Sequence, residues 1–317
     1  MTRVAILDDY QDVARRMADW SSLPSGVDVV VFQDHLGAEA AVAARLAEFD
    51  AVVAMRERTP FPQTLLERLP RLRLLVTTGM RNASIDLRAA AERGVLVCGT
   101  GGLPYPTAEL AWALILSLVR RVPREDRATR LGGWQETLGT GLNGKTLGVL
   151  GLGTLGSRVA RVGCAFEMNV VAWSQNLTAE RAAAVGTTLV DRDDLLARAD
   201  VVTIHLVLSG RTRGLIGARE LALMRNTAYL VNTSRGPIVE EQALIHALQT
   251  GAIAGAGLDV YDEEPLPRDH PLRRLPNTVI TPHLGYVTEE TYRIFYGEAL
   301  EDVRAYLAGA PVRVLRP

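Results

Sequence analysis

Lysine is almost absent from this sequence, because Lys145 is the only one among 317 residues. It stands in NGKTLGVL, a polar turn before an apolar run, where we expect a solvated turn residue. A mechanism that passes through a lysine Schiff base, or that uses lysine as an acid, is therefore a poor candidate.

Cysteines and long apolar runs are also scarce. Cys98 and Cys164 each stand in apolar surroundings with no metal-binding or redox spacing, which predicts buried free thiols of a cytoplasmic protein. The longest apolar run, LAWALILSLV (110–119), is too short to span a bilayer and predicts a buried helix. No export signal is visible in MTRVAILDDY. We therefore expect a cytoplasmic protein with no membrane partner and no metal site.

No charge of one sign dominates the chain. The formal net charge is -1, which argues against a dedicated nucleic-acid surface. Hydrophobic residues make up 48% and charged residues 22%, as in soluble globular proteins. The length allows two domains, each with its own core.

Short β-branched runs alternate with helical patterns along nearly the whole chain. Strands are predicted at 3–8, 27–32, 51–55, 72–78 and 95–99, and again at 146–153, 169–173, 200–206, 228–233, 254–260 and 277–282. A long helix is expected from Pro106 and a last one from Thr288 to Ala308. This alternation predicts two doubly wound parallel sheets, whose ligands lie beyond the carboxyl ends of the strands.

A glycine-rich loop, Gly151-Leu-Gly153-Thr-Leu-Gly156, joins an apolar strand to a helical pattern. Gly151 permits a tight turn, Gly153 lets the backbone approach a pyrophosphate, and Gly156 allows close packing of helix and strand. The helix N-terminus offers free N–H groups to phosphates. With a second strand about twenty residues further on, the loop predicts a dinucleotide site.

The turn after that second strand contains no acid. A carboxylate at this position would bond the ribose hydroxyls and repel a 2′-phosphate, but the turn offers Ser174, Gln175 and Asn176 instead. The predicted cofactor is therefore NAD or NADP, and the turn permits NADP without demanding it.

Three polar segments follow later strands of the second series. NTSRG carries Arg235, whose planar fork suits a carboxylate. TPHLG carries His283, which can move a proton near neutral pH when a carboxylate orients it. GLDVYDEEP supplies four acids: Asp259, Asp262, Glu263 and Glu264.

Taken together, these stretches resemble the D-isomer-specific 2-hydroxyacid dehydrogenases. The resemblance covers almost the whole chain and includes TTGMRNASIDLRAAAERGV, PYPTAELAWALIL, GGW, GKTLGVLGLGTLG, HLVLSGRTRGLIG, NTSRG, GLDVYDEEP and TPHLG. It implies an NAD(P)-dependent oxidoreductase that interconverts small 2-oxo acids and D-2-hydroxy acids. It also implies a homodimer, and the apolar helix around Trp112 is a candidate contributor.

The same resemblance implies a domain organisation. Residues 1–103 and 288–317 would form a discontinuous flavodoxin-like substrate domain, and residues 104–287 an inserted Rossmann domain for the cofactor. Hinge segments would let the cleft close and exclude water.

The resemblance also assigns roles to residues. Arg235 would bind the substrate carboxylate, His283 would exchange a proton with the 2-oxo group, and Glu264 would pair with His283. Other positions match the cofactor cleft: Thr107, Leu155, Gly156, His205, Thr233, Asp259 and Gly285. Asp259 would lie near the nicotinamide carboxamide. The first domain would contribute Gly79 and Met80, with Arg56 or Arg81 as further substrate-binding candidates.

Two alternatives stay open. Related scaffolds act on formate or phosphite, and others serve as non-catalytic, nucleotide-sensing partner proteins. A sensing role predicts interaction tails, which we do not expect here because the chain begins on its first strand and ends just past its last helix. The sequence does not name the 2-oxo acid, the preferred cofactor or the physiological direction.

Overall fold

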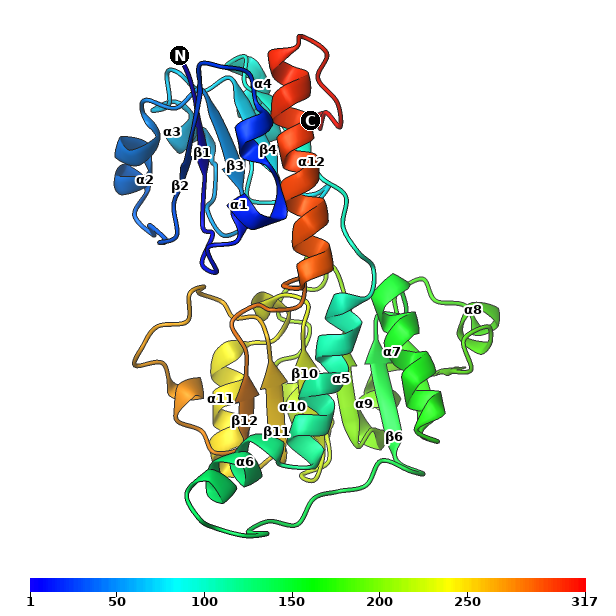
Figure 1. Cartoon of the computed structure of the whole chain (residues 1–317). Coiled ribbons are helices and arrows are strands. Elements are labelled where there is room, and N and C mark those ends of the chain that lie inside the picture. Colours follow the sequence, from blue (N-terminus) through cyan, green and yellow to red (C-terminus); the bar gives the residue numbers. More distant parts are fainter. The chain divides into compact units, whose positions relative to one another are not determined.

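The computed structural model describes all residues from Met1 to Pro317, and the chain divides into two compact units. Unit 1 comprises Met1–Leu103 and Thr288–Pro317, and unit 2 comprises Pro104–Val287. Each unit is a parallel sheet covered by helices (Figure 1). The predicted class, α/β with two doubly wound parallel sheets, is confirmed.

The sheet of unit 1 has five parallel strands in the order β2-β1-β3-β4-β5. They are β1 (Thr2–Ile6), β2 (Val27–Val31), β3 (Ala51–Ala54), β4 (Leu74–Thr77) and β5 (Leu96–Gly99). This is the strand order of flavodoxin-like folds. The strands are short and mostly apolar because both faces of the sheet are covered.

The helices of unit 1 come from both segments of the chain. They are α1 (Ala14–Met17), α2 (Glu39–Leu46), α3 (Gln63–Leu66), α4 (Leu87–Glu92) and α12 (Glu289–Leu307), with a 3₁₀ turn at Trp20–Ser22. Helix α12 begins after Thr288, whose hydroxyl caps the backbone N–H of Thr291, and packs against α1 and β4. The C-terminal segment is therefore part of this unit's core.

The sheet of unit 2 has seven parallel strands in the order β12-β11-β10-β9-β6-β7-β8. They are β6 (Thr146–Leu150), β7 (Asn169–Trp173), β8 (Thr188–Leu189), β9 (Val201–Ile204), β10 (Tyr229–Asn232), β11 (Gly255–Leu258) and β12 (Thr278–Ile280). The order reverses between β6 and β9, as in dinucleotide-binding folds. Ligands of such sheets lie beyond the carboxyl ends near this reversal.

Helices cover both faces of the second sheet. One apolar core lies under α5 (Pro106–Val119) and α7 (Thr154–Ala165). The other lies under α9 (Arg192–Arg198), α10 (Ala218–Leu223) and α11 (Glu241–Thr250). The remaining helices are α6 (Val122–Arg130) and α8 (Ala179–Ala183), with 3₁₀ turns at Gly236–Ile238 and Pro271–Arg273. None of the helices combines the length and apolarity that crossing a bilayer requires.

Several sequence-based expectations need correction. Cys98 is buried as expected, but Cys164 is exposed, because its position on α7 faces outward. Helix α6 falls in a segment expected to be merely polar, since VPREDRATR has no apolar period that would reveal a helix. Most predicted strands extend beyond the observed ones; β9, for example, ends at Ile204.

Candidate active site

Site residues predicted for the second domain stand directly after its strands. Gly151 follows β6, Ser174 follows β7, His205 follows β9, Thr233 follows β10 and Asp259 follows β11. Thr281, which was not among the predicted residues, follows β12 in the same way. Because all seven strands are parallel, these positions line one edge of the sheet.

The glycine loop leaves no space for side chains at two of its glycines. Gly151 has φ +100, and a Cβ there would meet the carbonyl oxygen of His205 at 2.4 Å. A Cβ on Gly156 would lie 1.9 Å from the Gly151 oxygen. Around Gly153, by contrast, nothing lies within 4 Å of the added atom. The loop is thus tightly packed on the protein side and open at the glycine where a pyrophosphate would approach.

The turn after β7 is tied to the glycine loop. The Leu152 N–H donates to Ser174 Oγ at 2.9 Å, so the serine hydroxyl already accepts one hydrogen bond and has its own hydrogen left to donate. Gln175 and Asn176 are exposed. The structure therefore presents a donor, and no acid, where a ribose or its 2′-phosphate would bind.

Three buried polar atoms of unit 2 lack a partner within the protein. One is Asn277 Oδ1, just before β12 and so at the opposite end of the strands. The other two, His205 Nδ1 and Thr233 Oγ1, belong to residues one position beyond the paired residues Ile204 and Asn232. His205 Nε2 bonds Thr203 Oγ1 at 2.9 Å, and burial lowers the pKa of His205 to about 4, so the ring is neutral. Orphaned polar atoms cost free energy unless a ligand or water completes them. These two fit a dinucleotide bound at this edge.

Arg235 lies in a turn that the side chain of Asn232 closes with two hydrogen bonds. The Asn232 side chain accepts the Ser234 N–H at 3.0 Å and donates to the Arg235 carbonyl at 2.9 Å. The guanidinium donates to the Ser234 carbonyl at 2.7 Å. These three hydrogen bonds fix both the turn and the side chain of Arg235.

The Arg235 turn packs directly against the acidic segment that follows β11. A Cβ on Gly236 would lie 2.1 Å from the carbonyl carbon of Tyr261, so only glycine allows this approach. Tyr261 is buried, and its hydroxyl donates toward the carbonyl oxygens of Leu258 and Thr281. Tyr261 thus joins the ends of β11 and β12 beside the Arg235 turn.

Glu264 and His283 form a hydrogen-bonded pair. His283 Nδ1 lies 2.6 Å from Glu264 Oε2, while Glu264 Oε1 accepts the Tyr261 N–H at 3.0 Å. An ionised carboxylate is only an acceptor, so Nδ1 carries the hydrogen of this bond. The other ring nitrogen, Nε2, is left to exchange a proton with a ligand. Among the acids of DEEP, the last one is the partner, as the sequence match implies.

Asp259 holds the loop that carries His283. Its Oδ1 accepts from Thr281 Oγ1 at 2.6 Å and from the Leu284 N–H at 2.7 Å, and its Oδ2 accepts the Gly285 N–H at 2.8 Å. Asp259 is fully buried; this burial raises its pKa, and the hydrogen bonds oppose the rise. His283 has φ +55, a left-handed conformation that costs a non-glycine residue about 1–3 kcal/mol. The Asp259 bonds offset that cost.

Thr107 closes the same loop from the other side. Its hydroxyl donates to the Gly285 carbonyl at 2.8 Å, and a Cβ on Gly285 would meet Thr107 Oγ1 at 3.1 Å. Thr107 stands in the first turn of α5, and Leu155 stands in the first turn of α7. The predicted cofactor residues of unit 2 therefore all belong to loops and helix starts at the carboxyl edge of the sheet.

The predicted substrate residues of unit 1 also come together. Arg56 follows β3 with φ +51, and its side chain crosses Gly79, where a Cβ would lie 1.8 Å from Nη1. Arg56 Nη1 donates to the Thr78 carbonyl at 3.2 Å. Met80, next to Gly79, is 48% exposed. These residues occupy the carboxyl ends of β3 and β4.

Sequence reasoning missed the residues that hold the site in place. Asn232, Tyr261 and Thr281 contact no predicted ligand, but each fixes a loop that carries a predicted site residue. Asn232 had a recognisable signal, because asparagine at a strand end favours a turn closed by its own side chain. Nothing in the sequence marks Tyr261 or Thr281.

Fold and site together define a class. The doubly wound sheet carries a dinucleotide loop, and two buried polar atoms at its carboxyl edge lack a partner. An arginine turn packs beside a segment that holds a histidine–carboxylate pair. This combination is typical of nicotinamide-dependent oxidoreductases.

Comparison with known proteins gives the family. The model of the D-isomer specific 2-hydroxyacid dehydrogenase NAD binding domain matches residues 112–285. A glyoxylate reductase of Aeropyrum pernix is 42% identical over 255 residues, which are 77% of this chain and 76% of that protein. The chain belongs to the D-isomer specific 2-hydroxyacid dehydrogenase family, so it is an oxidoreductase with a nicotinamide dinucleotide cofactor.

Other similar proteins are named for a different substrate. A D-3-phosphoglycerate dehydrogenase of Archaeoglobus fulgidus is 39% identical over 84% of this chain, but the chain spans only 51% of that protein. The crystal structure of a phosphoglycerate oxidoreductase from Vibrio cholerae has a TM-score of 0.93 at 38% identity, covering 98% of this chain and 100% of that one. The relatives thus share the chemistry class and differ in named substrate.

Proposed function

We propose that this protein reduces small 2-oxo acids to D-2-hydroxy acids with NAD(P)H, and catalyses the reverse oxidation. The observation that carries the proposal is the His283–Glu264 pair on a loop held by Asp259, beside the rigid Arg235 turn. A bound nicotinamide supplies or accepts the hydride at the 2-carbon of the substrate.

His283 moves the proton in this proposal. In the reducing direction, Nε2 of the protonated ring donates to the carbonyl oxygen of the substrate, and in oxidation it takes the proton back. Glu264 accepts the Nδ1 hydrogen in both directions, which keeps the ring oriented with Nε2 toward the substrate. Glu264 is itself fixed by the Tyr261 N–H.

Arg235 and unit 1 bind the substrate in this proposal. The Arg235 fork would bond the carboxylate and polarise the neighbouring 2-oxo group. Arg56, Gly79 and Met80 would contact the rest of the substrate. Residues 1–103 with 288–317 would then serve as the substrate domain, and residues 104–287 as the cofactor domain.

The choice between NAD and NADP would depend on the turn after β7. Ser174 already accepts the Leu152 N–H, so its hydroxyl hydrogen would be left to donate to the ligand, either to a ribose hydroxyl or to a phosphate oxygen. No carboxylate is present to repel a 2′-phosphate. We therefore expect NADPH to be accepted.

Steady-state reduction of glyoxylate, pyruvate and hydroxypyruvate, each with NADH and with NADPH, tests the proposal. Glyoxylate comes first because of the glyoxylate reductase at 42% identity. Turnover of any of the three supports the reaction, and NADPH matching or beating NADH supports acceptance of the 2′-phosphate. Absence of turnover with both cofactors would overturn the proposal. It would favour the alternatives, a dehydrogenase that acts on formate or phosphite, or a nucleotide-sensing partner protein.

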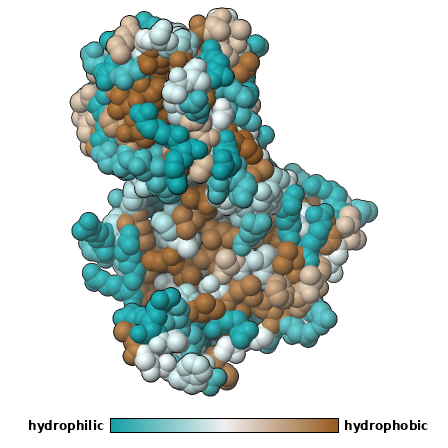
Figure 2. Space-filling model, viewed as in Figure 1, coloured by the Kyte–Doolittle hydropathy of each residue, from teal (hydrophilic) through white to brown (hydrophobic).

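We also propose that the chain forms a homodimer through unit 2. Figure 2 shows apolar side chains gathered over α5 and β12, and several large apolar residues of the segment after α5 are exposed: Val122, Leu131, Trp134 and Leu138. Trp112 itself is buried against Phe166, so it does not contribute surface. A cytoplasmic location stays a prediction from the cysteine content.

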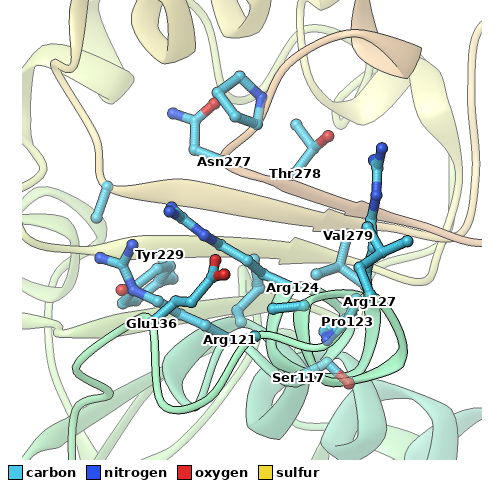
Figure 3. Close-up of a pocket in the computed structure, with 16 residues that line it drawn as sticks. Ser117, Arg121, Pro123, Arg124, Arg127, Glu136, Tyr229, Asn277, Thr278 and Val279 are labelled. Carbon is cyan, nitrogen blue, oxygen red and sulfur yellow. The ribbon is translucent and has the colours of Figure 1, made fainter.

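A pocket of about 790 Å³ lies beside the same segment, between α6 and the starts of β10 and β12 (Figure 3). Arg121, Arg124 and Arg127 line it together with Glu136, far along the strands from the carboxyl-edge site. An apolar patch bordered by polar residues is typical of a protein interface. Light scattering after size exclusion measures the state directly, and a monomer at micromolar concentration would contradict the dimer.

A further inference from the structure

The C-terminal tail of unit 1 runs along the edge of its sheet. After α12 the chain turns back, and residues near the end pair with β5 in an antiparallel manner through Cys98 and Val314. The Gly99 N–H donates to the Arg313 carbonyl at 3.0 Å, and the Leu315 N–H donates to the Val97 carbonyl at 2.8 Å. Because β5 is an edge strand, the tail covers backbone groups that would otherwise be open.

Arg313 anchors this tail to α12. Its guanidinium lies 3.0 Å from both Asp302 Oδ1 and Glu301 Oε2, and it donates to the Glu298 carbonyl at 2.8 Å. Asp302 is fully buried, and its second oxygen has no partner. Burial raises the pKa of Asp302 to about 7, and the nearby Arg313 opposes that rise. Arg313 is therefore the cation that compensates a buried acid.

Glu298 connects this cluster to the segment after β5. Its Oε2 lies 3.7 Å from Arg313 Nε and accepts the Gly101 N–H at 2.6 Å. A Cβ on Gly101 would lie 3.3 Å from both carboxylate oxygens of Glu298. Gly101 is among the last residues of unit 1 before the chain enters unit 2 at Pro104. The carboxylate thus fixes the place where the chain leaves unit 1.

The same segment holds the Gly79–Met80 turn. Thr100 Oγ1 accepts the Gly79 N–H at 2.8 Å and donates to the Gly101 carbonyl at 3.1 Å. A Cβ on Gly99 would meet the Gly79 oxygen at 2.8 Å, Leu315 Cδ1 at 3.2 Å and Met80 Cα at 3.3 Å. Tail, β5 and turn are in direct contact.

We propose that Arg313 is a positioning residue that, through Glu298, Gly101 and Thr100, sets the Gly79–Met80 turn for the substrate. The proposal rests on the proposed function only in that this turn contacts the 2-oxo acid. Arg313 touches neither substrate nor cofactor. A tail that only stabilised the unit would leave the geometry of the turn unchanged in the folded protein.

The test compares Arg313→Ala with the full-length wild-type chain. Hydrogen–deuterium exchange is followed on peptides covering residues 77–82 and 99–103, because the Gly79 and Gly101 amides donate the bonds in question. Kinetics use whichever of glyoxylate, pyruvate and hydroxypyruvate turns over fastest. We expect faster exchange at both amides and a KM for the 2-oxo acid raised about tenfold, roughly 1.4 kcal/mol, with kcat and the cofactor KM retained.

Matched variants separate positioning from stability. Arg293→Ala removes an exposed arginine of α12, the helix that anchors the tail, and should change neither measurement, because Arg293 is paired only with Glu289 one turn away. Glu298→Ala removes the Gly101 acceptor but leaves the Arg313–Asp302 bond, so it should reproduce the effect even if Arg313→Ala does not fold. Arg313→Lys, which keeps the charge without the fork, should restore part of the KM.

Unchanged exchange at Gly79 and Gly101 in the folded variants would overturn the proposal, as would a fall in kcat with an unaltered KM. Exchange needs no substrate. Absence of turnover in the wild-type chain would therefore count against the proposed function, while the exchange result would still decide the positioning role.

Discussion

The two units hold the residues at their carboxyl edges in different ways. In unit 2, the loops are fixed by side chains from the strand ends beside them, such as Asp259 for the His283 loop and Asn232 for the Arg235 turn. In unit 1, the Gly79–Met80 turn rests on β5, whose edge is covered by the distant C-terminal tail. The contacts that fix the loops of unit 2 therefore lie near strand ends that short sequence motifs mark. The contacts that fix the Gly79–Met80 turn of unit 1 join distant segments, which no short motif contains.

Buried acids illustrate the same difference. Asp259 in unit 2 accepts three hydrogen bonds with its two oxygens, whereas Asp302 in unit 1 has one oxygen with no partner. Both pKa values are raised by burial. Both acids therefore make folding stability depend on pH, and in Asp259 three hydrogen bonds oppose the rise of the pKa.

The largest expected effect is the loss of His283 in unit 2. His283→Ala should lower kcat by about 10²–10⁴-fold, since general acid–base catalysis contributes that much, and leave cofactor affinity nearly unchanged. Fluorescence titration with NADH and NADPH measures the affinity. The exposed His246 on α11 supplies the control, because His246→Ala should keep full turnover. An active His283→Ala enzyme would contradict the assigned role.

Asp259→Asn tests how far unit 2 depends on its loop-holding acid. The amide nitrogen of asparagine would face an N–H donor, so at least one bond to Leu284 or Gly285 is lost. We expect a loss of about 1–3 kcal/mol in the free energy of unfolding, measured with denaturant, and a lower kcat. The nearby Asp262→Asn, at an exposed position, should have little effect on either quantity. Equal stability of the two variants would show that the loop does not need the carboxylate.

Ser174→Asp tests which cofactor the turn after β7 accepts. A carboxylate here would repel a 2′-phosphate and bond ribose hydroxyls, so the ratio of kcat/KM for NADPH to that for NADH should fall about tenfold, roughly 1.4 kcal/mol. Ser174→Ala, which removes the Leu152 bond and the hydroxyl donor without adding a charge, should weaken both cofactors alike. An unchanged ratio in Ser174→Asp would mean that the 2′ position lies elsewhere.

The last prediction concerns the pH dependence of stability and Asp302 in unit 1. Its pKa is about 7 in the folded protein against an ordinary 3.8. As the pH rises between these values, the unfolded chain releases a proton that the folded state retains, so folding stability falls, and above about pH 7 this contribution levels off. Asp302→Asn removes that slope. Between about pH 5 and pH 8, the free energy of unfolding should change less in Asp302→Asn than in the wild-type chain. Parallel pH profiles of the two proteins would contradict the raised pKa of Asp302.

Much of the fold could be predicted from the sequence, because short apolar strands alternating with amphipathic helices have few stable arrangements. The glycine loop was recognisable from its context, because an apolar strand precedes it, a helical pattern follows it and a second strand comes about twenty residues later. Helix α6 was not, because VPREDRATR lacks an apolar period, and neither was β8, which has only two residues. The exposure of Cys164 was also missed, since an apolar neighbourhood in sequence does not determine which face of a helix a residue occupies.

The class of fold, the dinucleotide loop and the residue types of the chemistry follow from local pattern and spacing, so the amino-acid sequence was enough to predict them. The folded arrangement was needed to show that Asp259 bonds the His283 loop, that the Tyr261 N–H bonds Glu264, and that Glu298 links Arg313 to Gly101. Those contacts join residues far apart in the chain. Their partners are therefore chosen by strand order and helix packing, which no local pattern records.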